Sequence, residues 1–148
     1  MDSSSPDQDS KFSPEETAAC CEGPLHQAAV EGLRLFNAGE YFEAHEALET
    51  AWRDETGPIR NLYRGILQVG VAYHHIQRGN YRGARKLFLR CRQWLDPFPD
   101  ECRGIQVGKL RRDARRVEDV VIRLGPEGIA HVPESLFQPV EYSLSSEA

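Results

Sequence analysis

Residues 36–52 read FNAGEYFEAHEALETAW, and this stretch predicts the corner of a helical hairpin. Gly39 suits the left-handed position just past the end of one helix, and a second helix is expected from about residue 40. On a helical wheel the apolar side chains of the second helix share one face. That face consists of Tyr41, Ala44, Leu48 and Trp52. The stretch therefore predicts two helices that pack against each other across a glycine turn.

Hydrophobic periodicity and glycine or proline breaks predict five helices and almost no strand. Their expected ranges are 25–37, 40–54, 58–78, 81–95 and 107–124. The third is apolar nearly all round, so we expect it to be buried on most sides. A weak internal repeat, in which Gly39, Tyr41 and Ala44 recur as Gly79, Tyr81 and Ala84, is typical of tetratricopeptide-like hairpins. Two copies are too few for a solenoid. The expected fold is all-α, a compact bundle of two such hairpins plus a fifth helix.

The ends of the chain differ from its centre. Residues 1–23 are polar and are expected to form a disordered N-terminal tail, before a bundle domain over 24–126. Residues 127–148 contain two prolines and no clear period, so we expect an extended strap with a disordered acidic end. No run approaches the ~18 apolar residues of a membrane span. No apolar export segment precedes the bundle, so a cytoplasmic location is expected.

The four cysteines are Cys20, Cys21, Cys91 and Cys102. No two of them form a CxxC pair, so a structural zinc site is not expected. In a reducing cytosol the expected state of all four is the free thiol.

Charge is distributed unevenly along the chain. Residues 1–57 carry 13 acids and 3 bases, whereas residues 58–125 carry 15 bases and 6 acids. The basic half could be a nucleic-acid surface, or the two halves could pack against each other as oppositely charged helix pairs. The net charge of −5 favours the second interpretation. The segment KLRRDARR at 109–116 has no interleaved aromatic side chain that could stack a base. A small molecule or a protein is therefore the expected partner, and nucleic acid is not.

Polar side chains are expected to meet between the second and third helices. His45 and Glu49, four residues apart, share a surface at the border of the core face, whereas Glu43 and Glu46 turn outward. The third helix carries one polar stripe, consisting of Arg64, Gln68 and His75. Because buried polar groups need partners, the stripe is expected to meet His45 and Glu49.

Two interpretations of this cluster remain open. In the structural one, Glu49 pairs with Arg64 and the neutral histidines help to fix the register of the helices. In the functional one, His45, Glu49 and His75 bind a divalent metal such as zinc, manganese or iron. Glu49, Arg64 and Gln68 would then be the catalytic residues that orient substrate or a metal-bound water. Two features favour the structural interpretation: Glu49 stands where an HExxH motif needs its second histidine, and the charge of Arg64 opposes a cation.

The motif residues resemble a known family, the all-helical prokaryotic domain of unknown function 309. The resemblance covers about residues 26–125 and rests on FNAGEYFEAHEALETAW followed by Tyr63, Arg64, Gly65, Gln68, His75, Gly79-Asn80 and Gly83-Ala84. The chain keeps the family's polar motif positions, Glu43, His45, Glu46, Glu49, Arg64, Gln68 and His75. The resemblance implies a compact helical bundle and a metal-dependent hydrolase. The alternative is a non-catalytic tetratricopeptide-like binding or scaffold domain in which the same polar cluster is structural.

Overall fold

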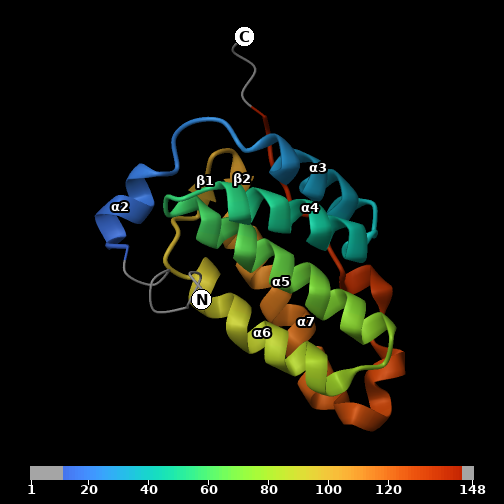
Figure 1. Ribbon diagram of the computed structural model, residues 1–148. Coiled ribbons are helices and arrows are strands. Elements are labelled where there is room, and N and C mark those ends of the chain that lie inside the picture. The colour runs from blue at the N-terminus through green and yellow to red at the C-terminus, as the bar shows by residue number, and fades with distance from the viewer. Residues whose placement is uncertain (1–11, 145–148) are drawn as a thin grey trace, which may run out of the picture.

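The computed structural model describes residues 12–144, and this part of the chain is all-α apart from one very short β hairpin (Figure 1). Five helices begin and end close to the expected residues. They are α3 (Gln27–Asn37), α4 (Tyr41–Asp54), α5 (Ile59–Gln77), α6 (Tyr81–Leu95) and α7 (Val107–Gly128). The predicted fold class is therefore confirmed. None of the described helices is both long enough and apolar enough to cross a membrane.

Glycine turns make the corners of both hairpins. Gly39 follows α3 with φ 82°, and Gly79 follows α5 with φ 72°, in the left-handed region that favours glycine. A Cβ at either position would have no neighbour within 4 Å, so backbone conformation rather than space selects glycine there. At the second corner the Asn80 side chain accepts a hydrogen bond from the backbone N–H of Gly83 at 2.9 Å and caps α6. These local signals explain why the helix boundaries are readable from the sequence.

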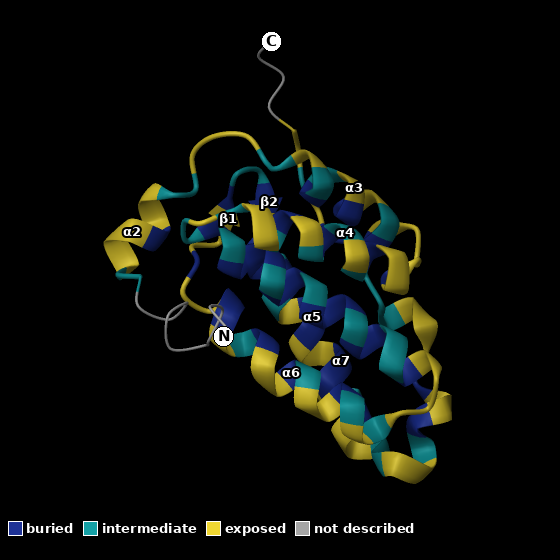
Figure 2. Cartoon of the chain, viewed as in Figure 1, coloured by how far each residue is buried: buried dark blue, intermediate teal, exposed yellow. Residues whose placement is uncertain are grey.

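Each long helix packs on the next one along the chain, from α3 through to α7. Figure 1 shows α5 between α4 and α6, and Figure 2 shows buried residues along α5 and along the inner faces of its neighbours. Two glycines permit close approach. A Cβ on Gly32 would lie 2.6 Å from Leu48 Cγ, and one on Gly65 would lie 2.6 Å from Leu95 Cδ2. The α3–α4 and α5–α6 pairs are therefore held at short helix-to-helix distances.

The C-terminal strap packs on the bundle through an aromatic contact. The rings of Phe137 and Tyr73 are stacked, with centroids 4.6 Å apart. Before this contact α7 bends at Gly125, where φ is 72°, and ends at Gly128. Two short 3-10 turns follow, η1 (Ile129–His131) and η2 (Glu134–Leu136). The expected disordered acidic end over 145–148 lies outside the described residues.

The N-terminal segment differs from the expectation. Helix α2 (Pro14–Ala19) occupies part of the predicted disordered tail, so that prediction is wrong for these residues. The physical reason is a capping box: the Ser13 hydroxyl accepts from the Glu16 N–H at 3.0 Å, and the Glu16 carboxylate accepts from the Ser13 N–H at 2.8 Å. Residues 1–11 of the predicted tail lie outside the described part of the chain.

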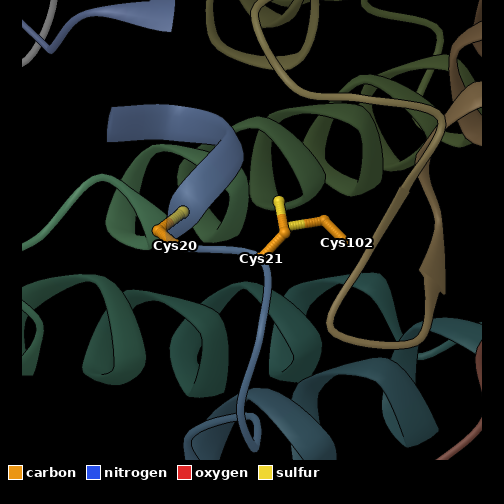
Figure 3. Close-up of side chains that lie close together, drawn as sticks. All are labelled: Cys20, Cys21 and Cys102. Atoms are coloured by element: carbon orange, nitrogen blue, oxygen red, sulfur yellow. A yellow bond between two sulfur atoms is a disulfide. The ribbon is translucent and has the colours of Figure 1, made fainter. Parts of the chain in front are cut away.

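A disulfide ties this segment to the rest of the fold. The short strands β1 (Glu101–Cys102) and β2 (Ile105–Gln106) pair antiparallel before α7. Cys102 is bonded to Cys21, 81 residues away in the chain (Figure 3). The prediction of free thiols is therefore wrong for these two cysteines, whereas Cys20 and Cys91 are free. Sequence spacing could not reveal the pair because tertiary packing brings the end of α2 to β1.

Candidate functional site

His45 and Glu49 lie on the exposed border of α4, as the wheel predicts. Each side chain is 32% exposed, and His45 Nε2 lies 4.0 Å from Glu49 Oε1. Glu43 and Glu46 are exposed. The other ring nitrogen of His45, Nδ1, is buried and has no hydrogen-bond partner in the described part of the chain. The pair thus places a carboxylate and an imidazole side by side on a partly solvent-exposed surface of α4.

Arg64 lies between two tryptophan rings that come from the neighbouring helices. Its guanidinium carbon is 4.7 Å from the ring centroid of Trp52 on α4 and 4.4 Å from that of Trp94 on α6. Each distance is within the range of a cation–π interaction. Arg64 therefore links α4, α5 and α6 at one level of the bundle.

The expected ion pair between Glu49 and Arg64 is replaced by one within α4. Glu49 Oε2 accepts a hydrogen bond from Arg53 Nη2 at 3.0 Å. Arg53 is one turn further along the same helix, so this pair needs no reach across the helix interface. The sequence contains both tryptophans, but only the crossing of three helices shows that they enclose Arg64.

The two adjacent histidines of α5 face different neighbours. His75 Nδ1 lies 3.3 Å from the side-chain nitrogen of Asn80, at the start of α6. Burial lowers the pKa of His75 below its ordinary value. The ring of His74 lies 6.1 Å from that of Phe42 on α4, and His45 contacts the same phenylalanine at 5.8 Å. His74 rather than His75 is therefore the α5 histidine that shares a neighbour with His45.

The expected metal ligands are not gathered at one point. Over residues 12–144, the group of three histidine, cysteine or carboxylate side chains whose ligand atoms lie within 4.8 Å of one another consists of three cysteines. His45, Glu49 and His75 do not form such a group. Gln68, on the stripe between them, is buried, and its Oε1 has no hydrogen-bond partner among the described residues. The structure therefore brings His45 to Glu49, and sets His75 against the start of α6.

A groove between α6 and α7 was not anticipated from the sequence. It encloses about 660 Å³. Its lining includes six arginines, Arg92, Arg111, Arg112, Arg115, Arg116 and Arg123. From the sequence, residues 109–116 were expected only to lack the aromatic side chains that stack nucleic-acid bases. The available signal was the density of arginines on α7, but only the packing of α6 beside α7 turns the arginine-bearing face into a concave wall.

Two of the groove arginines are occupied within the fold. Arg92 bonds the buried carboxylate of Glu118. Arg111 donates to Asp100 at 2.6 Å and to the carbonyl oxygens of Leu95 and Phe98 at 3.1 and 3.0 Å. The other four are exposed and make no hydrogen bond or ion pair with another described residue; they are Arg112, Arg115, Arg116 and Arg123.

Among residues 12–144, ion pairs form within each half of the charge distribution. Some join partners within 12–57, such as His26 with Asp54, and others join partners within 58–125, such as Arg92 with Glu118. Six arginines and three carboxylates line the groove, so its lining carries net positive charge.

The architecture defines an all-helical domain of two sequential hairpins and a further helix, and part of this domain is similar to a known family. Residues 29–87 match the model of the family described as "Domain of unknown function (DUF309)". This match confirms, over these residues, the resemblance noted in the sequence. The match contains all five residues of the predicted cluster and none of Cys20, Cys21 and Cys102.

Two relatives extend the similarity beyond that segment. An uncharacterized protein of Aquifex aeolicus (strain VF5) is 28% identical over 118 residues, which are 79% of this chain and 32% of the relative. The uncharacterized protein YpuF of Bacillus subtilis (strain 168) is 41% identical over 117 residues, 78% of this chain and 58% of the relative. The chain thus spans about a third and somewhat over half of these proteins' lengths.

Proposed function

We propose that this chain is a non-catalytic binding domain that holds an acidic, amphipathic segment of a partner protein in the groove between α6 and α7. The observation that carries the proposal is the arginine-lined wall of a groove of about 660 Å³. A cavity of this size is within the range of ligand-binding clefts.

Charge complementarity selects an acidic occupant. Arg112, Arg115, Arg116 and Arg123 are exposed at the groove, and the ion pairs of the fold leave their guanidinium groups to solvent. Asp96 and Asp119 are the acidic lining residues that oppose them without neutralising all four. Carboxylates of a partner can bind guanidinium groups through paired hydrogen bonds, which favours arginine over lysine at such surfaces.

Exposed apolar side chains beside the groove suggest that the occupant is amphipathic. Leu89 on α6 is 64% exposed and Ile122 on α7 is 46% exposed. Leu89 precedes the lining residue Arg92 by three positions, and Ile122 follows the lining residue Asp119 by three. Since residues three apart on a helix are neighbours, each apolar side chain lies next to a lining residue at the edge of the groove, although neither lines the groove itself. An amphipathic helix with acidic and apolar residues matches both features.

The polar cluster of α4 and α5 then has a structural role in this proposal. Arg64 between Trp52 and Trp94 joins three helices, and the His45–Glu49 pair completes the surface of α4. Helical hairpins held in this way could form a tetratricopeptide-like scaffold that presents α6 and α7.

Fluorescence anisotropy with a labelled acidic amphipathic peptide tests the proposal. We expect saturable binding that weakens as salt is raised, because exposed charges contribute to it. The double substitution Arg115→Glu and Arg116→Glu should weaken binding at least tenfold. The matched control, Arg82→Glu with Lys86→Glu, makes the same charge change at exposed α6 positions outside the groove lining and should retain most of the affinity. Equal loss in both variants, or tighter binding of single-stranded nucleic acid than of the peptide, would refute the proposal.

A metal-dependent hydrolase is the second candidate, and two unpaired buried atoms favour it. His45 Nδ1 and Gln68 Oε1 are buried and lack hydrogen-bond partners in the described chain, so either could receive a ligand. The donors His45, Glu49 and His75 do not fit an ion in this arrangement, because their ligand atoms are not within 4.8 Å of one another. We therefore assign no catalytic step to a metal at this cluster.

Metal analysis distinguishes the two candidates. Protein purified without a histidine tag should contain about one zinc, manganese or iron ion at this cluster if the second candidate is correct. That ion should be lost on His45→Ala and kept on Cys20→Ser. Absence of any His45-dependent ion would exclude the second candidate. We also propose a cytoplasmic location for the protein, as expected from the sequence.

A further inference from the structure

Three cysteine side chains lie together where α2 meets the β1–β2 hairpin (Figure 3). Cys20 and Cys21 directly follow α2, and Cys102 is the last residue of β1. Their sulfur atoms all lie within 4.8 Å of one another. Cys21 and Cys102 form the disulfide, and Cys20 is a free, partly buried thiol beside it.

We propose that reduction of the Cys21–Cys102 disulfide converts Cys20, Cys21 and Cys102 into a three-cysteine zinc site. A dithiol reductant supplies two electrons and two protons: the S–S bond breaks, two thiols form, and the reductant becomes a disulfide. Zn²⁺ then binds three thiolates and releases the three thiol protons to solvent. The fourth tetrahedral position is left for water or another ligand.

The distances between the sulfurs suit this cation. With Zn–S bonds of about 2.3 Å and tetrahedral angles, ligand sulfurs lie about 3.8 Å apart. In the oxidised form Cys20 is already within 4.8 Å of both other sulfurs. Cys21 and Cys102 must separate only from bonding distance to that spacing. Thiolates are also the ligands that zinc prefers among soft donors.

Hydrogen bonds from Arg103 hold the two segments together independently of the disulfide. Its backbone N–H donates to the Cys21 carbonyl at 2.9 Å. Its side chain donates from Nε to the Cys20 carbonyl at 2.6 Å and from Nη1 to the Pro24 carbonyl at 2.8 Å. Reduction removes the S–S bond and leaves these contacts, so the three thiols should stay near one another.

The position of Arg103 also suits the charge of the proposed site. Three thiolates and one Zn²⁺ carry a net charge of −1, and the guanidinium of Arg103 lies beside Cys20, to whose carbonyl oxygen it donates a hydrogen bond at 2.6 Å. A fixed cation beside a net anionic centre is favourable. The turn that places it is specific: Arg103 has φ 50°, and the following Gly104 has φ 88°. A Cβ on Gly104 would lie 2.1 Å from the Ser143 carbonyl oxygen, so this turn also packs on the C-terminal strap.

The absence of a CxxC motif does not argue against this site. Two adjacent cysteines and one 81 residues away from Cys21 cannot be recognised by spacing, because the fold rather than a single turn brings them together. A reducing compartment, such as the cytoplasm that the sequence predicts, would favour the thiol form. The proposal is independent of the groove between α6 and α7.

Zinc titration of the full-length, tag-free chain tests the proposal. We expect the protein reduced with tris(carboxyethyl)phosphine to bind about one Zn²⁺, and the oxidised protein to bind none at this site. Co²⁺ in place of zinc should give a thiolate-to-cobalt charge-transfer band. Cys20→Ser keeps the disulfide in the oxidised form, so it should fold, yet it should lose the band and the tightly bound zinc.

Cys91→Ala provides the matched control. Cys91 is buried in α6, its Sγ contacts the Phe88 carbonyl oxygen, and burial raises its pKa to about 12. This variant should bind zinc like the original chain, and so should His45→Ala. Failure of the reduced chain to bind zinc would overturn the proposal, as would equal zinc affinity in Cys20→Ser and the original chain.

Discussion

Replacing Arg64 by methionine tests whether this motif residue is a structural link between helices. The substitution keeps an unbranched side chain but removes the guanidinium that lies 4.7 Å from the Trp52 ring and 4.4 Å from the Trp94 ring. A cation–π contact contributes about 0.5–1 kcal/mol when exposed and about 2 kcal/mol when desolvated. Arg64 is partly buried and contacts two rings, so the expected loss in the free energy of unfolding is about 1–3 kcal/mol. For a chain of this size that loss corresponds to a Tm lower by roughly 3–10 °C.

Urea unfolding followed by far-ultraviolet circular dichroism measures this loss without relying on tryptophan fluorescence. Arg85→Met is the control, because Arg85 is exposed and its guanidinium lies 5.9 Å from a single ring, that of Tyr81. Its removal should cost about 0.5 kcal/mol or less. A double-mutant cycle of Arg64→Met with Trp94→Leu should give a coupling of about 1 kcal/mol. Stability unchanged in Arg64→Met, or a coupling near zero, would refute the structural role.

Three further predictions concern pH, helix packing and the disulfide. Burial holds the pKa of His75 below its ordinary value of 6.5. As pH drops below about 6.5, the unfolded chain therefore binds this proton before the folded chain does, and the free energy of unfolding falls. His75→Gln should make this loss between about pH 7 and pH 5 smaller in urea unfolding, and an unchanged pH profile would contradict the prediction. Gly32→Ala would put a Cβ 2.6 Å from Leu48 Cγ and should lower the free energy of unfolding by about 1–3 kcal/mol through overpacking. Gly57→Ala, whose Cβ would have no neighbour within 4 Å, should change it little, and thermal unfolding of both variants measures the difference. Cys21→Ser opens a crosslink between residues 81 apart and should cost about 2–4 kcal/mol under oxidising conditions, a difference that should disappear when both chains are measured with reductant and a chelator.

The helices were predictable because their signals are local. Gly39 and Gly79 adopt the left-handed conformation that ends a helix, and α3 to α7 begin and end near the expected residues. The capping box at Ser13 and Glu16 was an equally local signal for α2. Its helix was missed because the surrounding composition suggested disorder.

The candidate cluster was predictable only in part. Helical periodicity correctly put His45 and Glu49 at the border of the core and turned their acidic neighbours outward. It could not say that His75 contacts the start of α6, because the rotation and offset of neighbouring helices determine which side chains meet. The metal and catalytic roles assigned to the cluster stay predictions.

The sequence by itself determined the helical class, the order of the helices and the face that each one buries, because periodicity and turn chemistry act within a few residues. Tertiary structure alone decided three contacts between distant segments: Arg64 between two tryptophans, Cys21 bonded to Cys102, and the groove made by α6 beside α7. These features depend on how whole helices cross and on which distant segments pack together, and a local sequence pattern contains no information about either. The stretch FNAGEYFEAHEALETAW thus predicted the α3–α4 hairpin. The strongest candidate sites lie elsewhere, in the groove between α6 and α7 and where α2 meets β1.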